Sequence, residues 1–228
     1  MTSSQIEQSL KHINCWIFDL DNTLYPITKS MLSQLDDHMS NFVAKFLNVN
    51  VTEARQIQKN YFRKYGLTLR GLMLNHGLDP KEFFNAIGPM DLNEVYPNPD
   101  LGRAIKTLPG RKIIYTNSSS HHAQLVLDRL GFPEVFDAIF DITAANYIPK
   151  PAVEAYEHLC SLYKINPKKA AMVDDIVKNL EPAASLGMTT IWMQTNTEWA
   201  QNSATYKNIH FVTDDIGQWT QKMGRLSS

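Results

Sequence analysis

The chain has 228 residues, 43% of them hydrophobic, which is enough apolar material for one sizeable core or for a core that carries a smaller inserted domain. Its 22 basic and 23 acidic residues give a net charge of −1, so no overall field would draw the protein onto nucleic acid or an anionic membrane. We therefore expect a small-molecule partner, with no nucleic acid and no membrane.

The cysteines and the N-terminal segment indicate the cellular compartment to expect. Cys15 and Cys160 are too few for a disulfide framework and are not spaced as zinc ligands, which is typical of a reducing environment. Residues 1–14 lack the apolar run of a signal peptide, and no apolar run is long enough to cross a membrane. The expected location is the cytoplasm.

The first strand signal is an apolar run at 13–18 that stops abruptly at Asp19, as buried parallel strands do. From 26 to about 98 the pattern then has helical periodicity and no convincing strand. A proline-rich segment at 97–99 predicts a hinge that returns the chain to the core. The helices expected within this insertion are 31–47, 52–65, 68–76 and 80–87.

Strands and helices alternate in the rest of the chain, which predicts a mostly parallel sheet with helices on both faces. Ligands of such sheets bind at the carboxyl ends of the strands. The expected strands are 112–115, 138–140, 170–173 and 189–193, with a last candidate at 210–212, and the expected helices are 121–130, 152–163 and 176–186.

Two carboxylates follow the first strand in the motif Asp19-x-Asp21-x-Thr23. Side chains two positions apart on extended backbone point the same way, so both carboxylates would face one site. They would repel each other unless a cation neutralised them or one held a proton, and both outcomes suit phosphoryl transfer. Taken alone, the motif is equally a solvated turn.

Further polar residues fall at the ends of later strands. The second strand runs into Thr116 and Asn117 before a helix, where hydroxyl, amide and helix N-terminal N–H groups could bind a phosphate oxygen. Lys150 lies between two prolines, and its ammonium can offset the charge of a nucleophile and a phosphate. Asp174 and Asp175 close the fourth strand, and paired carboxylates are typical Mg²⁺ ligands.

Four other polar residues attract attention. His121 and His122 resemble a ligand pair, but adjacent helical residues diverge by about 100° and cannot both face one metal. We interpret them as a solvated helix start. Arg70 and His76, in the insertion, either contact a substrate or pair with nearby carboxylates.

Together, the strand-end motifs resemble the four motifs of the haloacid dehalogenase (HAD) superfamily, and the resemblance runs from about Cys15 to Met193. It implies an α/β fold: a Rossmann-like, mostly parallel sheet core formed by 1–25 and 98–228, with a small α-helical cap domain, 26–97, inserted after the first strand. The four motifs are Asp19-x-Asp21-x-Thr23, Thr116-Asn117, Lys150 and Asp174-Asp175.

The resemblance implies roles for the first motif. Asp19 would be the nucleophile and a Mg²⁺ ligand. Asp21 would be the general acid/base and would offer its backbone carbonyl to the metal. The presence of Asp21 favours a phosphatase over a dehalogenase, because halide departure needs no proton donor.

The other motifs would serve the phosphate and the metal. Thr116 and Asn117 would bind phosphate, and Lys150 would steady the nucleophile. Asp175 would bind Mg²⁺, with Asp174 assisting directly or through water.

Three longer segments, 18–26, 65–72 and 149–151, resemble the pyrimidine 5′-nucleotidase group of the superfamily. The helical insertion lies between the first and second motifs, as in the branch without a second cap. One departure is in the fourth motif, where Ile176 replaces a small hydroxyl residue and Asn179 replaces a further acid, which leaves the number of direct metal ligands open.

We therefore expect a Mg²⁺-dependent phosphomonoesterase that acts through an aspartyl-phosphate on a small phosphorylated metabolite, with pyrimidine nucleoside 5′-monophosphates preferred. Arg70 would read the base or sugar. One alternative is a broad-specificity phosphatase for sugar phosphates, phosphoglycolate or cofactor phosphates. Another is a catalytically inactive HAD-like interaction protein, against which the intact acidic and lysine motifs argue. The oligomeric state is not predicted.

Overall fold

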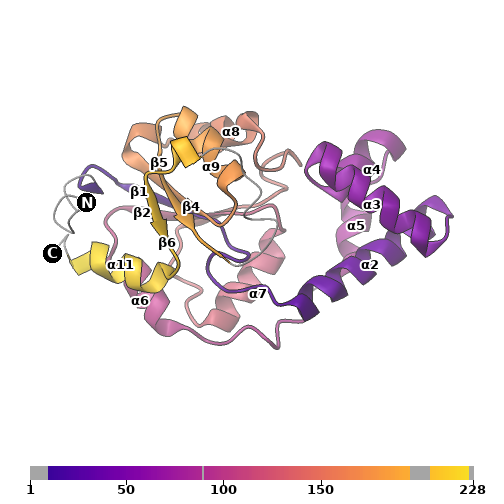
Figure 1. Cartoon of the computed structure of the whole chain (residues 1–228), viewed down its shortest axis with the longest axis horizontal. Coiled ribbons are helices and arrows are strands. Elements are labelled where there is room, and N and C mark those ends of the chain that lie inside the picture. Colours follow the sequence, from indigo (N-terminus) through magenta and orange to yellow (C-terminus); the bar gives the residue numbers. More distant parts are fainter. Residues whose placement is uncertain (1–9, 89, 196–205, 226–228) are drawn as a thin grey trace. The chain divides into compact units, whose positions relative to one another are not determined.

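The computed structural model describes residues 10–88, 90–195 and 206–225. The chain divides into two compact units, whose elements are labelled in Figure 1. The sheet unit comprises Met1–Pro26, Val95–Asn146 and Lys150–Ser228, and the helical unit comprises Ile27–Glu94 and Tyr147–Pro149.

The sheet unit is built on a six-stranded sheet of order β3-β2-β1-β4-β5-β6, in which each neighbouring pair is parallel. The two central strands, β1 and β4, are buried along their whole length. This is why β1 is apolar throughout and β4 is apolar until its last residue, Asp174, instead of alternating between apolar and polar residues. The strands are β1 (Cys15–Phe18), β2 (Arg111–Tyr115), β3 (Ala138–Phe140), β4 (Ala170–Asp174), β5 (Thr189–Met193) and β6 (Phe211–Thr213).

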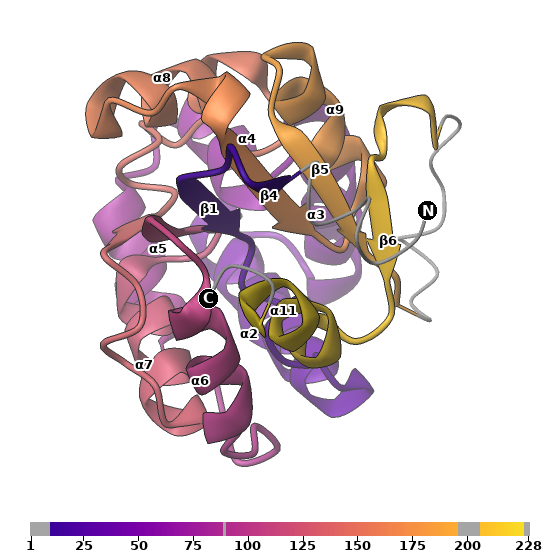
Figure 2. The ribbon, with the colours of Figure 1, turned by 90° about the vertical axis from the view of Figure 1, so that its left-hand side faces the viewer.

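Helices cover both faces of this sheet, with α6, α7 and α11 on one side and α8 and α9 on the other (Figure 2). Their bounds are α6 (Pro99–Thr107), α7 (Ser120–Leu130), α8 (Val153–Tyr163), α9 (Val177–Ser185) and α11 (Ile216–Arg225), with short 3₁₀ turns at Pro167–Lys169 and Tyr206–Asn208. The parallel α/β class predicted from the sequence is therefore confirmed.

The helical unit consists, in its described residues, of α2 (Lys29–Leu47), α3 (Val51–Tyr65), α4 (Thr68–His76) and α5 (Pro80–Ile87). Side-chain caps from Thr28, Asn50 and Asp79 start three of these helices. The helices enclose a small apolar core of their own, formed by Phe42, Val43, Ala54, Leu69, Leu72, Leu78 and Phe83.

The segment Tyr147–Pro149 belongs to the helical unit although it is distant in sequence. Tyr147 packs against the apolar core of this unit, and Arg70 donates a hydrogen bond from Nη1 to its carbonyl oxygen at 2.7 Å. The unit therefore includes three residues that directly precede Lys150 in the chain.

Two helices of the described part of the chain were not predicted. The segment at 97–99, read as a hinge, is instead the start of α6, where Asn98 caps the helix by accepting from the Leu101 N–H and Pro99 occupies the first turn. The other is α11, whose apolar residues recur at helical spacing near the end of the chain. Among the described residues, no helix combines the length and the apolar character needed to span a membrane.

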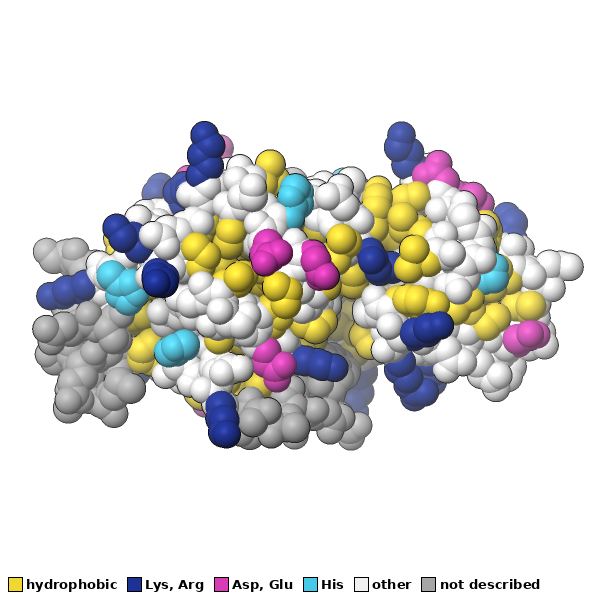
Figure 3. Space-filling model, turned by 90° about the horizontal axis from the view of Figure 1, so that it is seen from above, with side chains coloured by type: hydrophobic (Ala, Val, Ile, Leu, Met, Phe, Trp, Pro, Cys, Tyr) yellow, Lys and Arg dark blue, Asp and Glu magenta, His cyan; other side chains and the backbone are white. Residues whose placement is uncertain are grey.

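Basic and acidic side chains are interspersed on the face of the protein shown in Figure 3. This mixture agrees with the nearly balanced composition of 22 basic and 23 acidic residues.

Candidate active site

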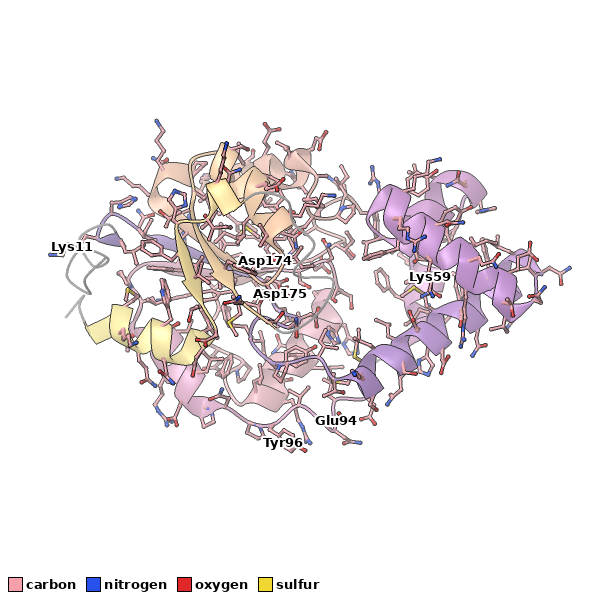
Figure 4. All side chains as sticks on the ribbon, in the orientation of Figure 1. Lys11, Lys59, Glu94, Tyr96, Asp174 and Asp175 are labelled. Carbon is pink, nitrogen blue, oxygen red and sulfur yellow. The ribbon has the colours of Figure 1, made fainter. Side chains whose placement is uncertain are left out.

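The sheet delivers several polar residues to one edge. Asp19 continues the ladder of β1, with its N–H bonded to the Val173 carbonyl at 2.9 Å, and Thr116 continues β2, with its N–H bonded to the Phe140 carbonyl at 3.1 Å. Asp174 is the last residue of β4, the neighbour of β1. Since all these strands are parallel, their carboxyl ends meet at the same edge. Figure 4 labels Asp174 and Asp175 there.

Lys150 is a buried cation between two carboxylates. Its Nζ donates to Asp19 Oδ1 at 2.7 Å, to Asp174 Oδ2 at 2.7 Å and to the Tyr115 carbonyl at 3.0 Å. Burial alone would lower the pKa of Lys150, but the charges of Asp174 and Asp19 raise it above its usual value. The lysine therefore stays charged and fixes the position of Asp19.

Asn117 holds the backbone of this lysine. Its Oδ1 accepts from the Lys150 N–H at 2.9 Å, and its Nδ2 donates to the Lys150 carbonyl at 3.4 Å. Its side chain was predicted to bind phosphate, whereas in the structure both ends of the amide bond to Lys150. Asn117, in the second motif, thus positions Lys150, the third motif.

Asp19, Asp174 and Asp175 form a buried acidic cluster whose ligand atoms lie within 4.8 Å of one another. Burial raises the pKa of Asp19 to about 7, although the neighbouring charge of Lys150 opposes the rise, and burial with the charges of Asp19 and Asp174 raises the pKa of Asp175 to about 8. Lys150 bonds to two of these three acidic groups, so a divalent cation would relieve the remaining negative charge. A set of carboxylate oxygens suits a hard ion, and the residues present therefore fit Mg²⁺.

The members of this cluster differ in how many protein donors they already have. Asp174 uses both oxygens: Oδ2 accepts from Lys150, and Oδ1 accepts from the Ile176 N–H at 2.9 Å and from Asn179 Nδ2 at 3.0 Å. The Asn179 that replaces an expected acid is therefore a donor that orients Asp174. In the hydrogen bonds of the described residues, Asp175 accepts through Oδ2 from Asn22 Nδ2 at 2.7 Å.

The turn after β1 supplies these supporting contacts. Asn22 has a left-handed backbone, with φ of 68°, which asparagine tolerates better than most residues. Its amide is thereby directed to Asp175. Thr23 donates from Oγ1 to Asp19 Oδ2 at 2.8 Å, so both oxygens of Asp19 have protein donors.

Asp21 is surrounded by hydrogen-bond donors. Tyr25 donates to Oδ1 at 2.6 Å, His122 Nε2 lies 3.0 Å from the same oxygen, and Ser118 donates to Oδ2 at 2.7 Å. Thr116 Oγ1 lies 3.5 Å from Oδ2. Burial favours a higher pKa, but the hydrogen bond and charge of His122 and the bonds from Tyr25 and Ser118 lower the pKa of Asp21 to about 2.

The prediction that both histidines form a solvated helix start is wrong for His122. Its side chain is only 12% exposed, whereas His121 is exposed. The angular divergence that rules out a ligand pair also turns one ring inward when the other faces solvent. The spacing of the sequence carries no signal for which of the two rings turns inward.

Arg70, the predicted specificity residue, lies in the helical unit. It is half-buried, and its guanidinium donates to the Tyr147 carbonyl. His76 also has a partner there, the hydroxyl of Tyr61, at 2.6 Å from Nε2.

Comparison with known proteins identifies the family. A family model described as haloacid dehalogenase-like hydrolase matches residues 13–187. Over 198 residues the chain is 28% identical to Phosphate metabolism protein 8 of Saccharomyces cerevisiae, covering 76% of this chain and 59% of that protein. Over 149 residues it is 29% identical to an Enolase-phosphatase E1 of Shewanella, covering 63% of this chain and 59% of that protein. The chain thus spans less than two thirds of the length of these curated relatives.

Solved structures share the fold at low sequence identity. A HAD phosphatase from Thermococcus onnurineus has a TM-score of 0.62 and 18% identity, covering 93% of this chain and 98% of that one. An L-2-haloacid dehalogenase from Xanthobacter autotrophicus has a TM-score of 0.56 and 14% identity, covering 92% and 97%. The fold therefore occurs with both chemistries, and the side chains at the strand ends have to distinguish them. With the family model spanning most of the chain and both acidic motifs in place at the sheet edge, the protein belongs to the haloacid dehalogenase-like hydrolases.

Proposed function

We propose that the chain is a Mg²⁺-dependent phosphomonoesterase that forms an aspartyl-phosphate on Asp19. The observation that carries the proposal is the geometry around this carboxylate, which is held by Lys150 and Thr23 and belongs to the acidic cluster. A carboxylate fixed in this way is poised as a nucleophile, because little orientational freedom is left to lose on reaction.

The reaction would proceed in two steps on this chain's residues. A carboxylate oxygen of Asp19 attacks phosphorus, the bond to the leaving oxygen breaks, and Asp21 gives that oxygen a proton. A water molecule then attacks the phosphorus of the phosphoenzyme, and Asp21 takes the proton that the water releases. Inorganic phosphate leaves, and Asp19 is restored as a carboxylate.

The low pKa of Asp21 makes it a carboxylate in the resting protein, which suits the second step. The first step needs the protonated form. A bound phosphate dianion would favour that form by like-charge repulsion, so Asp21 would take up a proton when substrate binds.

Asp19, Asp175 and the backbone carbonyl of Asp21 would hold Mg²⁺, which when bound neutralises charge on the phosphoryl oxygens. We propose that Asp174 assists through water, because it already accepts three hydrogen bonds from the protein, whereas each oxygen of Asp19 has one donor. Thr116 would bind a phosphate oxygen. Asn117 would act by holding Lys150.

For the substrate we propose a nucleoside 5′-monophosphate, with pyrimidines preferred. The support is the sequence resemblance of 18–26, 65–72 and 149–151 to the pyrimidine 5′-nucleotidase group. Arg70, which lies in the segment 65–72, bonds to the Tyr147 carbonyl, two residues before the segment that begins at Pro149. We propose that Arg70 reads the base or sugar.

Phosphate release from a panel of monophosphates, with Mg²⁺ and with a chelator, tests this function. We expect Mg²⁺-dependent release, faster from UMP and CMP than from AMP, GMP or sugar phosphates. Arg70→Ala should lower kcat/KM for UMP about three- to tenfold, the loss of one hydrogen bond, with little change for p-nitrophenyl phosphate. Equal rates on all esters would replace the nucleotidase assignment with a broad-specificity phosphatase. No release from any ester would contradict the phosphatase itself.

A further inference from the structure

Asp21 is held asymmetrically by the sheet unit. Its Oδ1 has two partners, the Tyr25 hydroxyl at 2.6 Å and His122 Nε2 at 3.0 Å. Its Oδ2 accepts from Ser118 at 2.7 Å and lies 3.5 Å from the hydroxyl of Thr116. One oxygen is therefore anchored by two large side chains, and the other lies toward the residue proposed to bind phosphate.

The local structure fixes the place of the His122 ring. Ser119 caps α7 by accepting from the His122 N–H at 3.2 Å, so the helix begins directly after the second motif and His122 falls in its first turn. The ring is 12% exposed, and its Nε2 also lies 3.4 Å from the Tyr25 hydroxyl. Since a carboxylate only accepts hydrogen bonds, Nε2 must carry the proton that is directed to Asp21.

We propose that His122 is a positioning residue for the acid/base Asp21: together with Tyr25 it anchors Oδ1, so that Oδ2 is the oxygen that exchanges the proton with the leaving group and the attacking water. This inference rests on the proposed phosphatase function. In the first step the proton leaves Asp21 Oδ2 for the leaving oxygen as the bond from that oxygen to phosphorus breaks. In the second step Oδ2 takes a proton from water.

The role has a selective consequence. A leaving alkoxide needs the proton, whereas p-nitrophenolate leaves without one. The value of kcat/KM covers the steps from free enzyme and substrate up to departure of the leaving group. It therefore includes the first proton transfer and leaves out the second. Loss of the anchor should therefore impair alkyl esters and spare p-nitrophenyl phosphate.

The test compares His122→Ala and His122→Gln with His121→Ala, a matched control on the exposed neighbour. Two substrates are used: p-nitrophenyl phosphate, and whichever alkyl monophosphate of the panel the unmodified enzyme cleaves best. We expect His122→Ala to lower kcat/KM for the alkyl ester about 10- to 100-fold, the range for losing a hydrogen bond to a charged group. For p-nitrophenyl phosphate the loss should stay within about threefold. His122→Gln, which keeps an N–H donor near the position of Nε2, should recover most of the loss, and His121→Ala should match the unmodified enzyme.

A double variant supplies a second, independent readout. If His122 acts through Asp21, His122→Ala should add almost nothing to the loss caused by Asp21→Asn. Equal losses on both substrates, a glutamine variant as impaired as the alanine variant, or fully additive losses would each overturn the positioning role. Thermal melts of each variant check that the fold persists, and the glutamine variant decides the matter if His122→Ala does not fold. An unmodified enzyme that released no phosphate would refute the proposed function first, an outcome distinct from these.

Discussion

Lys150 is the residue on which the charge balance of the site depends. Its ammonium is almost fully buried and lies 2.7 Å from oxygens of both Asp19 and Asp174. A buried ion pair of this kind adds little to the free energy of unfolding when it is compared with apolar side chains in place of all its members. Removal of one partner alone, however, leaves an uncompensated charge and costs about 3–5 kcal/mol.

Lys150→Met should therefore both destabilise and inactivate the protein. We expect a loss of about 3–5 kcal/mol in the free energy of unfolding, measured by urea titration without metal, because Asp19 and Asp174 remain buried without their cation. Phosphate release should fall by at least about 100-fold. Lys178→Met, at an exposed lysine of α9, is the control. A Lys150→Met protein as stable as this control would show that the ion pairs are not formed as described.

At the residue scale, the sequence predicts the side chains that we propose to react and misses some of those that hold them in place. Asp19, Asp174 and Asp175 follow buried strands, and parallel topology alone brings strand ends together. His122 and Tyr25 depend instead on how α7 and the first turn are rotated, which no spacing reveals. Asn117 is a case between the two: its place was predicted, but its partner is the Lys150 backbone.

At the scale of elements, close backbone approaches fix the central strands. Gly110 precedes β2 and has φ of +78°, and a Cβ there would lie 2.1 Å from the Asn14 carbonyl oxygen. The same carbonyl accepts from the Arg111 N–H at 3.0 Å, at the start of the β1 and β2 pairing. A side chain at this position would therefore push apart the strands that carry Asp19 and Thr116.

Gly110→Ala should destabilise the sheet unit much more than Gly131→Ala. Gly131 also has positive φ, +84°, but a Cβ there meets nothing within 4 Å. We expect about 1–2 kcal/mol for Gly131→Ala, the cost of the left-handed backbone alone, and about 3 kcal/mol or more for Gly110→Ala. Urea unfolding monitored by tryptophan fluorescence gives both values. Equal losses would mean that the Asn14 contact adds nothing.

The elements also show where sequence patterns stop being informative. The short buried strands were predicted well because apolar runs that end in Asp or Thr mark them. The helix α6 was missed because Pro99 and its neighbours were read as a hinge, although Pro in the first turn with Asn98 before it also starts a helix. The grouping of Tyr147–Pro149 with α2 to α5 arises from tertiary packing, and local sequence does not encode it.

At the scale of the whole molecule, the acidic cluster links folding to pH and metal. The pKa values of Asp19 and Asp175 are raised in the folded protein to about 7 and about 8, from an ordinary value of 3.8. Between these pH values the folded protein therefore keeps protons on the two carboxyl groups that the unfolded chain has already released. Without metal, this part of the stability is present below the unfolded pKa and is lost as pH rises toward 8. Mg²⁺, which we propose binds the ionised carboxylates, would offset that loss.

The increase in Tm caused by Mg²⁺ should therefore be larger near pH 8 than near pH 6. Thermal melts with excess Mg²⁺ and with a chelator at the two pH values measure the difference, and other titrating groups largely cancel from it. In Asp175→Asn, which lacks one carboxylate of the cluster, the Mg²⁺ effect should shrink at both pH values. An effect of Mg²⁺ that was independent of pH would contradict the assignment of the cluster as the metal site.

The central claim, that Asp19 is the nucleophile of a phosphoryl transfer, is tested most directly by phosphate release from p-nitrophenyl phosphate with Mg²⁺ by Asp19→Asn and the unmodified protein. An amide in place of the carboxylate cannot form the phosphoenzyme, and the replacement removes one charge from a crowded acidic cluster, so the variant should remain folded. The account predicts steady release by the unmodified protein and none by the folded variant. Release by Asp19→Asn at a rate close to that of the unmodified protein would contradict it.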